Sequence, residues 1–377
     1  MKITVFVNSM GSGGAERVAA TLANAWSERG HDVTLIATFT GRGSCFYSLS
    51  DKIEFIYLAD VIESTARGPV SYVKRILSIR KLIRERNVDI VVSLLTNVNM
   101  VVIAALQGTG VPIIACEHSN PIADGRRPFW NWMGRFFYPK ASVVTVLTEG
   151  VVEQFRTILG GAKNIMVVPN PLPAGLERDS VHTDKEKVDS HVIGVGRLQP
   201  LKRFDMLIRS FAKIVSEFPE WKLVIIGEGP DRKRLECQIA ELGLTERIFL
   251  PGKTTDPWSS MRRASLFALT SKYEGLPMAM MEAMALGVPV VAVDCPSGPR
   301  ELTEGGVVGS LVGHSDEDAY AQALADLMRA GALREELGRR GADSIRRRYS
   351  IDAVMKIWDR VFKVAIESRK YGRDAHQ

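Results

Sequence analysis

An arginine and a lysine, Arg197 and Lys202, stand five residues apart in the loop that follows the run Gly194-Val195-Gly196. Arginine offers a planar fork of hydrogen-bond donors and lysine a compact point charge, so both heads could converge on one diphosphate. Together they would offset the charge of a departing nucleoside diphosphate and remove the need for magnesium. The alternative is a pair of solvated surface cations, which is usual for basic residues in a loop.

Two glutamates, Glu274 and Glu282, enclose the sequence Gly-Leu-Pro-Met-Ala-Met-Met. Leu276 and Pro277 mark the expected start of a helix, because proline is tolerated at an early helical position. Glu274 then lies in a loop at the carboxyl edge of a parallel sheet, where ligands of open α/β folds bind, and Glu282 about two turns into the helix. Carboxylates there can accept hydrogen bonds from sugar hydroxyls; a helix-capping acid and a surface acid are the alternative.

A glycine turn, Gly11-Ser12-Gly13-Gly14, precedes a helical pattern from Val18 to Trp26. Such a turn at a helix N-terminus is an anion site. A dinucleotide fingerprint would require glycine where Glu16 stands, and an acid at the end of the second strand, where Ala37 and Thr38 stand. NAD binding is therefore disfavoured, and a tight strand-to-helix turn without a ligand is the alternative.

Short β-branched runs alternate with helical patterns on both sides of a polar stretch, and these elements must position the residues above. Most runs are apolar on both faces, which is typical of a buried parallel sheet covered by helices. The pattern predicts an α/β chain with two Rossmann-like domains facing a cleft. The expected limits are residues 1–172, a linker over 173–190, residues 191–350, and a C-terminal helix over 351–377 that crosses back to the first domain. The expected strands are 3–8, 33–38, 53–58, 90–94, 112–115, 143–147, 165–168, 191–196, 222–226, 247–250, 266–270 and 288–293.

The C-terminal part reads as continuously helical from Asp316 to about Lys370, with many arginines on a solvated face. Asp316, Glu317 and Asp318 stand at the start of this pattern, where acids favour the helix dipole. We therefore expect a helix cap there and not a metal site.

Length and composition limit the domain number and the kinds of partner that are possible. A chain of 377 residues is longer than one hydrophobic core usually supports, so two domains are expected. The four cysteines form no CxxC pair, which argues against a zinc cage or a disulfide framework and fits a reducing cytoplasm. We expect no signal peptide and no membrane-spanning helix. The net charge of +6 fits nucleotide phosphates, lipid headgroups or nucleic acid, but no nucleic-acid-binding module is recognisable.

The chain resembles glycosyltransferase family 4 in five motifs that occur in this order. They are Gly13-Gly14-Ala15-Glu16-Arg17, Glu117-His118-Ser119-Asn120, Pro169-Asn170-Pro171, Arg197 with Lys202, and Glu274 with Glu282. The resemblance spans nearly the whole chain. It implies a GT-B fold in which residues 1–172 form the acceptor-side domain and residues 191–350 bind the nucleotide sugar.

The resemblance also implies a role for each matching position. Gly13 and Gly14 would approach the donor phosphates, Arg197 and Lys202 would bind the diphosphate, and Glu282 would hold the ribose hydroxyls. Glu274 would lie beneath the donor sugar, and the backbone amides of Gly275 to Met278 would contact sugar and phosphate. His118 would contact a hydroxyl of the donor sugar at the reacting centre. The family retains anomeric configuration by front-face substitution, in which the leaving phosphate oxygen takes the acceptor's proton, so neither an enzyme nucleophile nor a metal is expected.

Within the family, the motifs with Ser297-Gly298-Pro299-Arg300-Glu301 are similar to bacterial enzymes that extend polyprenyl-diphosphate-linked oligosaccharides, including N-acetylgalactosamine transferases. A UDP-N-acetylhexosamine such as UDP-GalNAc is therefore the favoured donor, with no cofactor. A UDP- or GDP-hexose transferase in polysaccharide or O-antigen synthesis stays open. A nucleotide-sugar epimerase of the same architecture is disfavoured by the spacing of the two glutamates.

A basic helix from Tyr72 to Arg84 has a mostly apolar face that Arg80 interrupts, and an aromatic and basic stretch runs from Arg126 to Trp132. Such segments can lie on anionic membrane surfaces. We therefore expect a cytoplasmic protein at the periphery of the inner face of the cytoplasmic membrane. Two ordinary helices that pack on the sheet with basic rims are the alternative.

Overall fold

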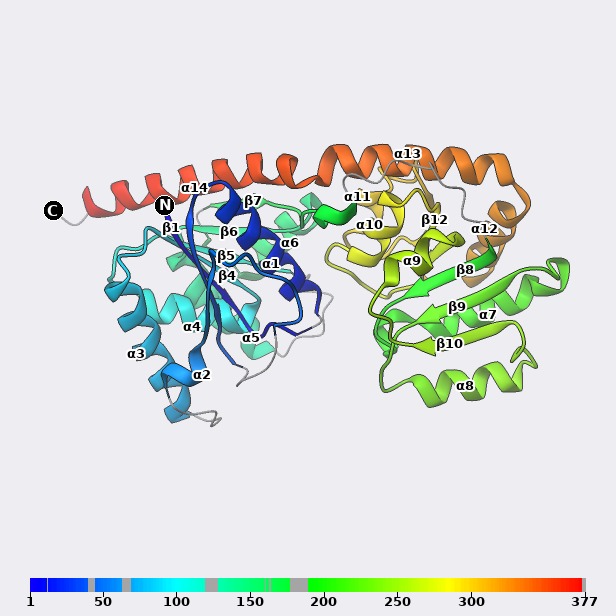
Figure 1. Cartoon of the computed structure of the whole chain (residues 1–377), viewed down its shortest axis with the longest axis horizontal. Helices are drawn as coiled ribbons and strands as arrows, with labels where there is room; N and C mark the ends of the chain where they lie inside the picture. Colours follow the sequence, from blue (N-terminus) through cyan, green and yellow to red (C-terminus); the bar gives the residue numbers. More distant parts are fainter. Residues whose placement is uncertain are drawn as a thin grey trace. The chain divides into compact units, whose positions relative to one another are not determined.

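The computed structural model describes residues 1–11, 13–39, 45–62, 69–118, 128–159, 161–162, 164–176 and 189–374. The chain divides into two compact units (Figure 1). Unit 1 comprises Met1–Pro171 with Ile351–Gln377, and unit 2 comprises Leu172–Ser350. Most of the expected linker, 173–190, lies outside the described residues.

Unit 1 is built on a seven-stranded parallel sheet with the order β3-β2-β1-β4-β5-β6-β7. Its strands are β1 (Lys2–Val7), β2 (Asp32–Ala37), β3 (Glu54–Tyr57), β4 (Ile90–Leu94), β5 (Ile113–Cys116), β6 (Val143–Val146) and β7 (Ile165–Val167). The central strands are buried on both faces, as continuous β-branched runs predict. Because every strand runs the same way, all carboxyl ends meet at one edge of the sheet.

Helices cover both faces of this sheet. They are α1 (Gly14–Glu28), α2 (Leu58–Val61), α3 (Pro69–Glu85), α4 (Thr96–Leu106), α5 (Pro128–Phe137), the 3₁₀ turn η1 (Tyr138–Lys140), α6 (Glu149–Leu159) and α14 (Ile351–Asp374). The last helix, α14, packs on α1: the Trp358 ring meets Trp26 edge-on at 5.1 Å between centroids, and Phe362 lies 5.4 Å from Trp26. Buried aromatic contacts of this kind make the C-terminal helix part of the unit 1 core.

Unit 2 is built on a six-stranded parallel sheet with the order β10-β9-β8-β11-β12-β13. Its strands are β8 (Asp189–Val195), β9 (Lys222–Ile226), β10 (Ile248–Gly252), β11 (Ala264–Leu269), β12 (Val290–Val293) and β13 (Ser310–Val312). The edge strand β13 was not predicted, because its three residues follow a glycine-rich stretch and form no apolar run. In the described part of the chain, no helix has the length and apolarity needed to span a bilayer.

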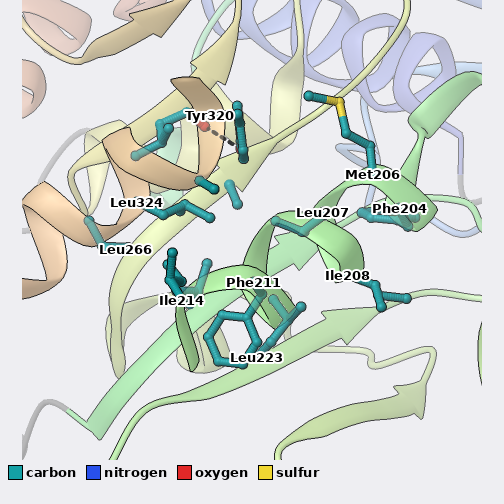
Figure 2. Packing of buried hydrophobic residues seen from close by; sticks show 14 of the residues in the cluster. Phe204, Met206, Leu207, Ile208, Phe211, Ile214, Leu223, Leu266, Tyr320 and Leu324 are labelled. Carbon is teal, nitrogen blue, oxygen red and sulfur yellow. Dashed lines mark hydrogen bonds between the residues drawn. The ribbon is translucent and has the colours of Figure 1, made fainter. Parts of the chain in front are cut away.

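The helices of unit 2 enclose a second core, shown in Figure 2. They are η2 (Ala174–Leu176), η3 (Pro200–Lys202), α7 (Phe204–Ile214), η4 (Val215–Glu217), α8 (Arg232–Glu241), α9 (Pro257–Arg262), α10 (Met278–Ala285), α11 (Pro299–Leu302), α12 (Glu317–Arg329) and α13 (Gly331–Tyr349). Phe211 of α7 and Leu324 of α12 pack into this core, and the buried Tyr320 hydroxyl donates to Val291 O at 3.0 Å. The predicted cap is confirmed, since Asp316 Oδ1 accepts from Ala319 N at 2.9 Å.

The prediction of one continuous helix after Asp316 is wrong. Ala330, with ψ of 81°, and Ser350, with ψ of 152°, break it into α12, α13 and α14. The arginines are also not all on a solvated face. Arg348 donates to Glu301 O and Leu302 O at 2.8 and 2.9 Å, and Arg346 donates to Ala285 O at 2.9 Å. These guanidinium groups add donors to carbonyls at the C-terminal ends of α10 and α11, where the regular i+4 helical hydrogen bonds end.

Candidate functional site

The loops that leave β8 and β11 bring Lys202 and Glu274 together at the carboxyl edge of the unit 2 sheet. Lys202 Nζ lies 2.6 Å from Glu274 Oε1, with the two side chains 21% and 11% exposed. The backbones are joined as well, because Thr270 Oγ1 donates to Lys202 O at 2.9 Å and Lys272 N donates to Leu201 O at 2.8 Å. The two loops therefore form one rigid rim that presents an ion pair with access to solvent.

Arg197 lies in the same turn, between β8 and η3, and its side chain is exposed. Within the described residues it forms no hydrogen bond or ion pair. The aliphatic part of the Lys202 side chain packs beside Gly196, the residue before Arg197: a Cβ added to Gly196 would lie 3.4 Å from Lys202 Cε. The turn thus brings both cations to one loop, but only Lys202 has an acidic partner.

Glu274 is held at both its side chain and its backbone. The Ser271 hydroxyl donates to Glu274 Oε1 at 2.6 Å, and the Ser297 hydroxyl donates to Glu274 O. The next residue, Gly298, has a φ of +79°, and an added Cβ would lie 2.6 Å from Pro277 Cδ. Only glycine allows this close approach, so the 297–298 segment fixes the loop that carries Glu274.

Cys295 lies close to the ion pair but is no candidate nucleophile. Burial raises the pKa of its thiol to about 12, and the negative charge of Glu274 adds to the increase, while Lys202 opposes it. The thiol is therefore neutral at physiological pH, and a neutral thiol is a weak nucleophile.

The helix α10 begins at Met278, two residues later than predicted, with Pro277 as its N-cap. Pro277 has no N–H, so the expected contacts from the amides of residues 275–278 reduce to those of Gly275, Leu276 and Met278. No side chain of the described residues caps this helix end. Its amides and the positive end of the helix dipole are suited to an anion.

Glu282 lies in the second turn of α10, nearer the start than predicted because the helix begins later. It is only 3% exposed, and Trp258 Nε1 of α9 donates to its Oε2 at 2.9 Å. Trp258 was missed by the sequence analysis, since no motif or periodicity links positions 258 and 282. Ser271, three residues before its partner Glu274, was also missed, because it belongs to none of the motifs.

In unit 1, Gly13 caps the N-terminus of α1 and Arg17 N donates to Gly13 O at 3.1 Å. The carboxylate of Glu16 folds back onto this turn, where Ser9 Oγ donates to its Oε1 at 2.6 Å. A Cβ on Gly13 would lie 2.1 Å from Glu16 Oε2, whereas one on Gly14 would meet nothing within 4 Å. The expected anion site thus already has a carboxylate beside Gly13, and Gly14 faces open space.

His118 follows β5, next to a buried carboxylate that organises the loop. Glu117 accepts hydrogen bonds from Thr96 Oγ1 at 2.9 Å, from Asn99 Nδ2 at 3.3 Å and from the Tyr138 hydroxyl. A buried carboxylate requires such donors. Glu117 therefore anchors β5 to α4 and η1, and its place in the Glu-His-Ser-Asn motif is structural; Ser119 and Asn120 lie outside the described residues.

The His118 ring lines a small cavity in unit 1 together with Cys116, Asn170 and Trp358. Burial lowers the pKa of His118 to about 4, although a hydrogen bond with Asn170 opposes the decrease. His118 Nε2 is enclosed and has no hydrogen-bond partner among the described residues. The imidazole is therefore neutral near pH 7, and its Nε2 can donate to or accept from a hydroxyl group, depending on the tautomer.

The helix α3 differs from the simple basic helix that its sequence predicts. Arg75 is buried and donates to Thr38 O at 3.2 Å, and Arg80 donates to Ala105 O and Gln107 O at 3.2 and 2.8 Å. Arg80 thus does not interrupt an outward apolar face; it satisfies carbonyls at the C-terminal end of α4. The exposed face instead carries Tyr72, Val73 and Leu77 beside the lysines and Arg84.

The helix α5 exposes three aromatic side chains with helical spacing. Phe129, Trp132 and Phe136 are 55%, 64% and 58% exposed, and Lys140 Nζ lies 3.6 Å from the centroid of the Phe136 ring. Trp130, between them in sequence, packs against the core. Arg126 and Arg127, which precede this helix in the sequence, lie outside the described residues.

Two family models match the chain in succession. Residues 13–171 match the glycosyl transferase 4-like domain, and residues 177–344 match the glycosyl transferases group 1. The chain is 29% identical over 339 residues to the Campylobacter jejuni GalNAc-α-(1→4)-GalNAc-α-(1→3)-diNAcBac-PP-undecaprenol α-1,4-N-acetyl-D-galactosaminyltransferase, a match that covers 89% of this chain and 91% of that enzyme. It is 27% identical to the N-acetylgalactosamine-N,N'-diacetylbacillosaminyl-diphospho-undecaprenol 4-α-N-acetylgalactosaminyltransferase of the same organism, with coverages of 89% and 92%.

Solved structures share the fold over nearly the whole chain. Sucrose-phosphate synthase from Thermosynechococcus elongatus superposes with a TM-score of 0.82 at 17% identity, covering 96% of this chain and 98% of that one. Anabaena HepE in complex with UDP superposes with a TM-score of 0.78 at 19% identity, covering 96% and 99%. These likenesses confirm the predicted GT-B fold class. The chain belongs to glycosyltransferase family 4, an enzyme family that transfers sugars, with a glycosyl transferase 4-like domain followed by a group 1 domain.

Proposed function

We propose that this glycosyltransferase moves an N-acetylhexosamine, such as GalNAc, from a UDP-sugar to a growing polyprenyl-diphosphate-linked oligosaccharide. The observation that supports a nucleotide-sugar site most strongly is the Lys202–Glu274 pair, 2.6 Å apart at the carboxyl edge of the unit 2 sheet. The same unit carries the open N-terminus of α10 and the buried carboxylate of Glu282. The names of both Campylobacter relatives support the acceptor class.

In this proposal the Lys202 ammonium, the exposed Arg197 and the amides at the start of α10 stabilise the diphosphate as it leaves. Charge that develops on a leaving group is best stabilised by donors that are already in position. Glu282 accepts hydrogen bonds from the ribose hydroxyls, and Glu274 accepts from the donor sugar. For the turn at Gly13 and Gly14 of unit 1, we propose that its backbone amides bind phosphate oxygens of the donor.

The reaction is proposed to retain anomeric configuration by front-face substitution. The leaving phosphate oxygen takes the proton of the acceptor hydroxyl, so no side chain must act as nucleophile. We propose that neutral His118 forms a hydrogen bond with a hydroxyl of the donor sugar, for which its enclosed Nε2, unpartnered within the described residues, must become accessible when the donor binds. The ammonium group of Lys202 and the guanidinium group of Arg197 take the role that a divalent metal would otherwise have.

A UDP- or GDP-hexose donor for polysaccharide or O-antigen synthesis is the alternative within the same reaction class. The epimerase and the nucleic-acid-binding protein are set aside, because both family models describe glycosyltransferases.

The test is transfer of labelled sugar from a panel of UDP-, GDP- and ADP-sugars to an extracted polyprenyl-diphosphate glycan fraction, with a metal chelator present. We expect label from a UDP-N-acetylhexosamine in the lipid phase. Label only from a hexose donor would select the alternative, loss of transfer with chelator would contradict metal independence, and release of free sugar alone would contradict the acceptor.

We also propose that unit 1 attaches to the inner face of the cytoplasmic membrane through α3 and α5. Their exposed aliphatic and aromatic side chains lie among basic residues, a combination that favours the interface of an anionic bilayer. Cosedimentation with vesicles of anionic lipid should fall when Phe129, Trp132 and Phe136 are changed to serine. The matched control is Leu333→Ser in unit 2, another exposed hydrophobic residue; equal losses in both would contradict the proposal.

A further inference from the structure

Glu282 is a carboxylate almost entirely removed from water, and it accepts a hydrogen bond from an indole N–H. Trp258 Nε1 donates to Glu282 Oε2 at 2.9 Å, while the residue is only 3% exposed. An indole N–H is neutral, so it satisfies one carboxylate oxygen without neutralising the charge. The indole therefore orients the carboxylate without neutralising it, whereas a lysine or arginine in the same place would do both.

The indole is itself held in place. Trp258 lies in the first turn of α9, where Asp256 Oδ1 caps the helix by accepting from Ser259 N at 3.1 Å. On the side of Gly175 the ring has no free space, because a Cβ on that glycine would lie 3.0 Å from Trp258 Cζ3. The ring is thus bounded by backbone on one side and by its hydrogen bond to Glu282 at the N–H.

We propose that Trp258 is a positioning residue for nucleotide recognition, which fixes the Glu282 carboxylate in the orientation that accepts the ribose hydroxyls. The inference rests on the proposed function, because it takes Glu282 as the ribose-binding acid. A carboxylate on a side chain with several rotatable bonds binds a diol well only when its plane is fixed before the ligand arrives. The Trp258 hydrogen bond and the contact with Gly175 provide that preorganisation.

The experiment measures the dissociation constants of UDP and 2′,3′-dideoxy-UDP by calorimetry on the full chain. Wild type should prefer UDP, and Glu282→Ala should remove that preference. Trp258→Phe replaces the indole by a smaller aromatic ring without an N–H. It should reduce the preference by about tenfold, the factor expected when one hydrogen bond to a charged group is lost. The affinity of Trp258→Phe for the dideoxy nucleotide should stay within twofold of wild type.

Two further variants separate positioning from general damage. Gly175→Ala pushes the ring with Trp258 intact and should reduce the same preference, which keeps the test valid if Trp258→Phe does not fold. Trp221→Phe, at another buried tryptophan of unit 2, is the matched control and should leave the preference unchanged.

Each outcome decides one question. An unchanged preference in Trp258→Phe and Gly175→Ala, with loss in Glu282→Ala, overturns the role of Trp258 and leaves the proposed function intact. Equal loss of affinity for both nucleotides indicates a structural role only and overturns the inference. If Glu282→Ala keeps the preference, the ribose assignment itself fails, and if wild type binds neither nucleotide, the UDP-sugar proposal fails.

Discussion

Replacing Lys202 by alanine removes the ammonium group that lies 2.6 Å from Glu274 Oε1. If that charge also meets the diphosphate as it leaves, turnover should fall by about 10²- to 10³-fold, the usual cost of one transition-state donor. The corresponding increase in the activation free energy is about 3–4 kcal/mol. Arg197→Ala, at the exposed second cation of the same turn, should also lower turnover strongly with the fold intact.

The effect of Lys202→Ala on folding should be much smaller. A carboxylate that loses its partner in a fully buried site costs about 3–5 kcal/mol. Glu274 retains some solvent access and the Ser271 hydroxyl at 2.6 Å, so we expect about 1 kcal/mol. For a domain of this size, that corresponds to a Tm lower by about 2–4 °C. A loss of turnover by two orders of magnitude therefore cannot come from unfolding.

The assay is single-donor transfer at saturating acceptor, with a melting curve for each variant. Lys272→Ala is the matched control, because this exposed lysine lies two residues before Glu274 in the same loop and forms no ion pair within the described residues. Turnover within threefold of wild type in both Lys202→Ala and Arg197→Ala would refute the diphosphate assignment. A loss in Lys272→Ala as large as in Lys202→Ala would show that net charge, and not this contact, matters.

Three further predictions concern packing and protonation. Gly298→Ala should lower Tm and turnover together, because the glycine has a φ of +79° and an added Cβ would lie 2.6 Å from Pro277 Cδ; unchanged values of both would contradict the role of this loop. Stability should fall as pH decreases from about 6.5 to 4, by up to about 1.4 kcal/mol per unit, since unfolded His118 takes up a proton in that range while the folded residue, with a pKa of about 4, does not. Urea unfolding should show a flatter pH dependence in His118→Gln, and an unchanged slope would count against a buried neutral ring. Trp358→Ala should cost about 3–5 kcal/mol in the free energy of unfolding, because its ring packs on Trp26 at 5.1 Å, and a loss below 1 kcal/mol would contradict this packing.

The strands were predictable because their signal is local. Runs such as Ile90–Leu94 are apolar on both faces, and the structure places strands within one or two residues of most predicted limits. The edge strand Ser310–Val312 has no such run, and its pairing with β12 depends on tertiary contact. The division of the C-terminal helices at Ala330 and Ser350 was also hidden, since neither residue is a strong helix breaker.

The site residues were predictable where a charged side chain stands in a motif whose chemistry is clear from the sequence. Lys202 and Glu274 were singled out separately, but their direct contact depends on how two distant loops meet. Trp258 and the structural role of Glu117 were not predictable, because a hydrogen bond between residues far apart in sequence leaves no spacing to read. Glu16 shows the converse case: the glycine turn was correctly located, and the carboxylate beside Gly13 became visible only in the structure.

The arginines of α13 have a consequence for anyone who selects variants by activity. Arg346 holds the end of α10, and a Cβ on Gly338 of α13 would lie 2.1 Å from Gly287 O, just after that helix. The C-terminal end of α10, the helix that carries Glu282, is therefore held in place by α13, more than fifty positions later in the chain. Random mutagenesis screened for lost transfer should yield substitutions at Gly338 and Arg346. These residues would act by supporting α10, and their loss should not be taken as evidence that α13 binds a substrate.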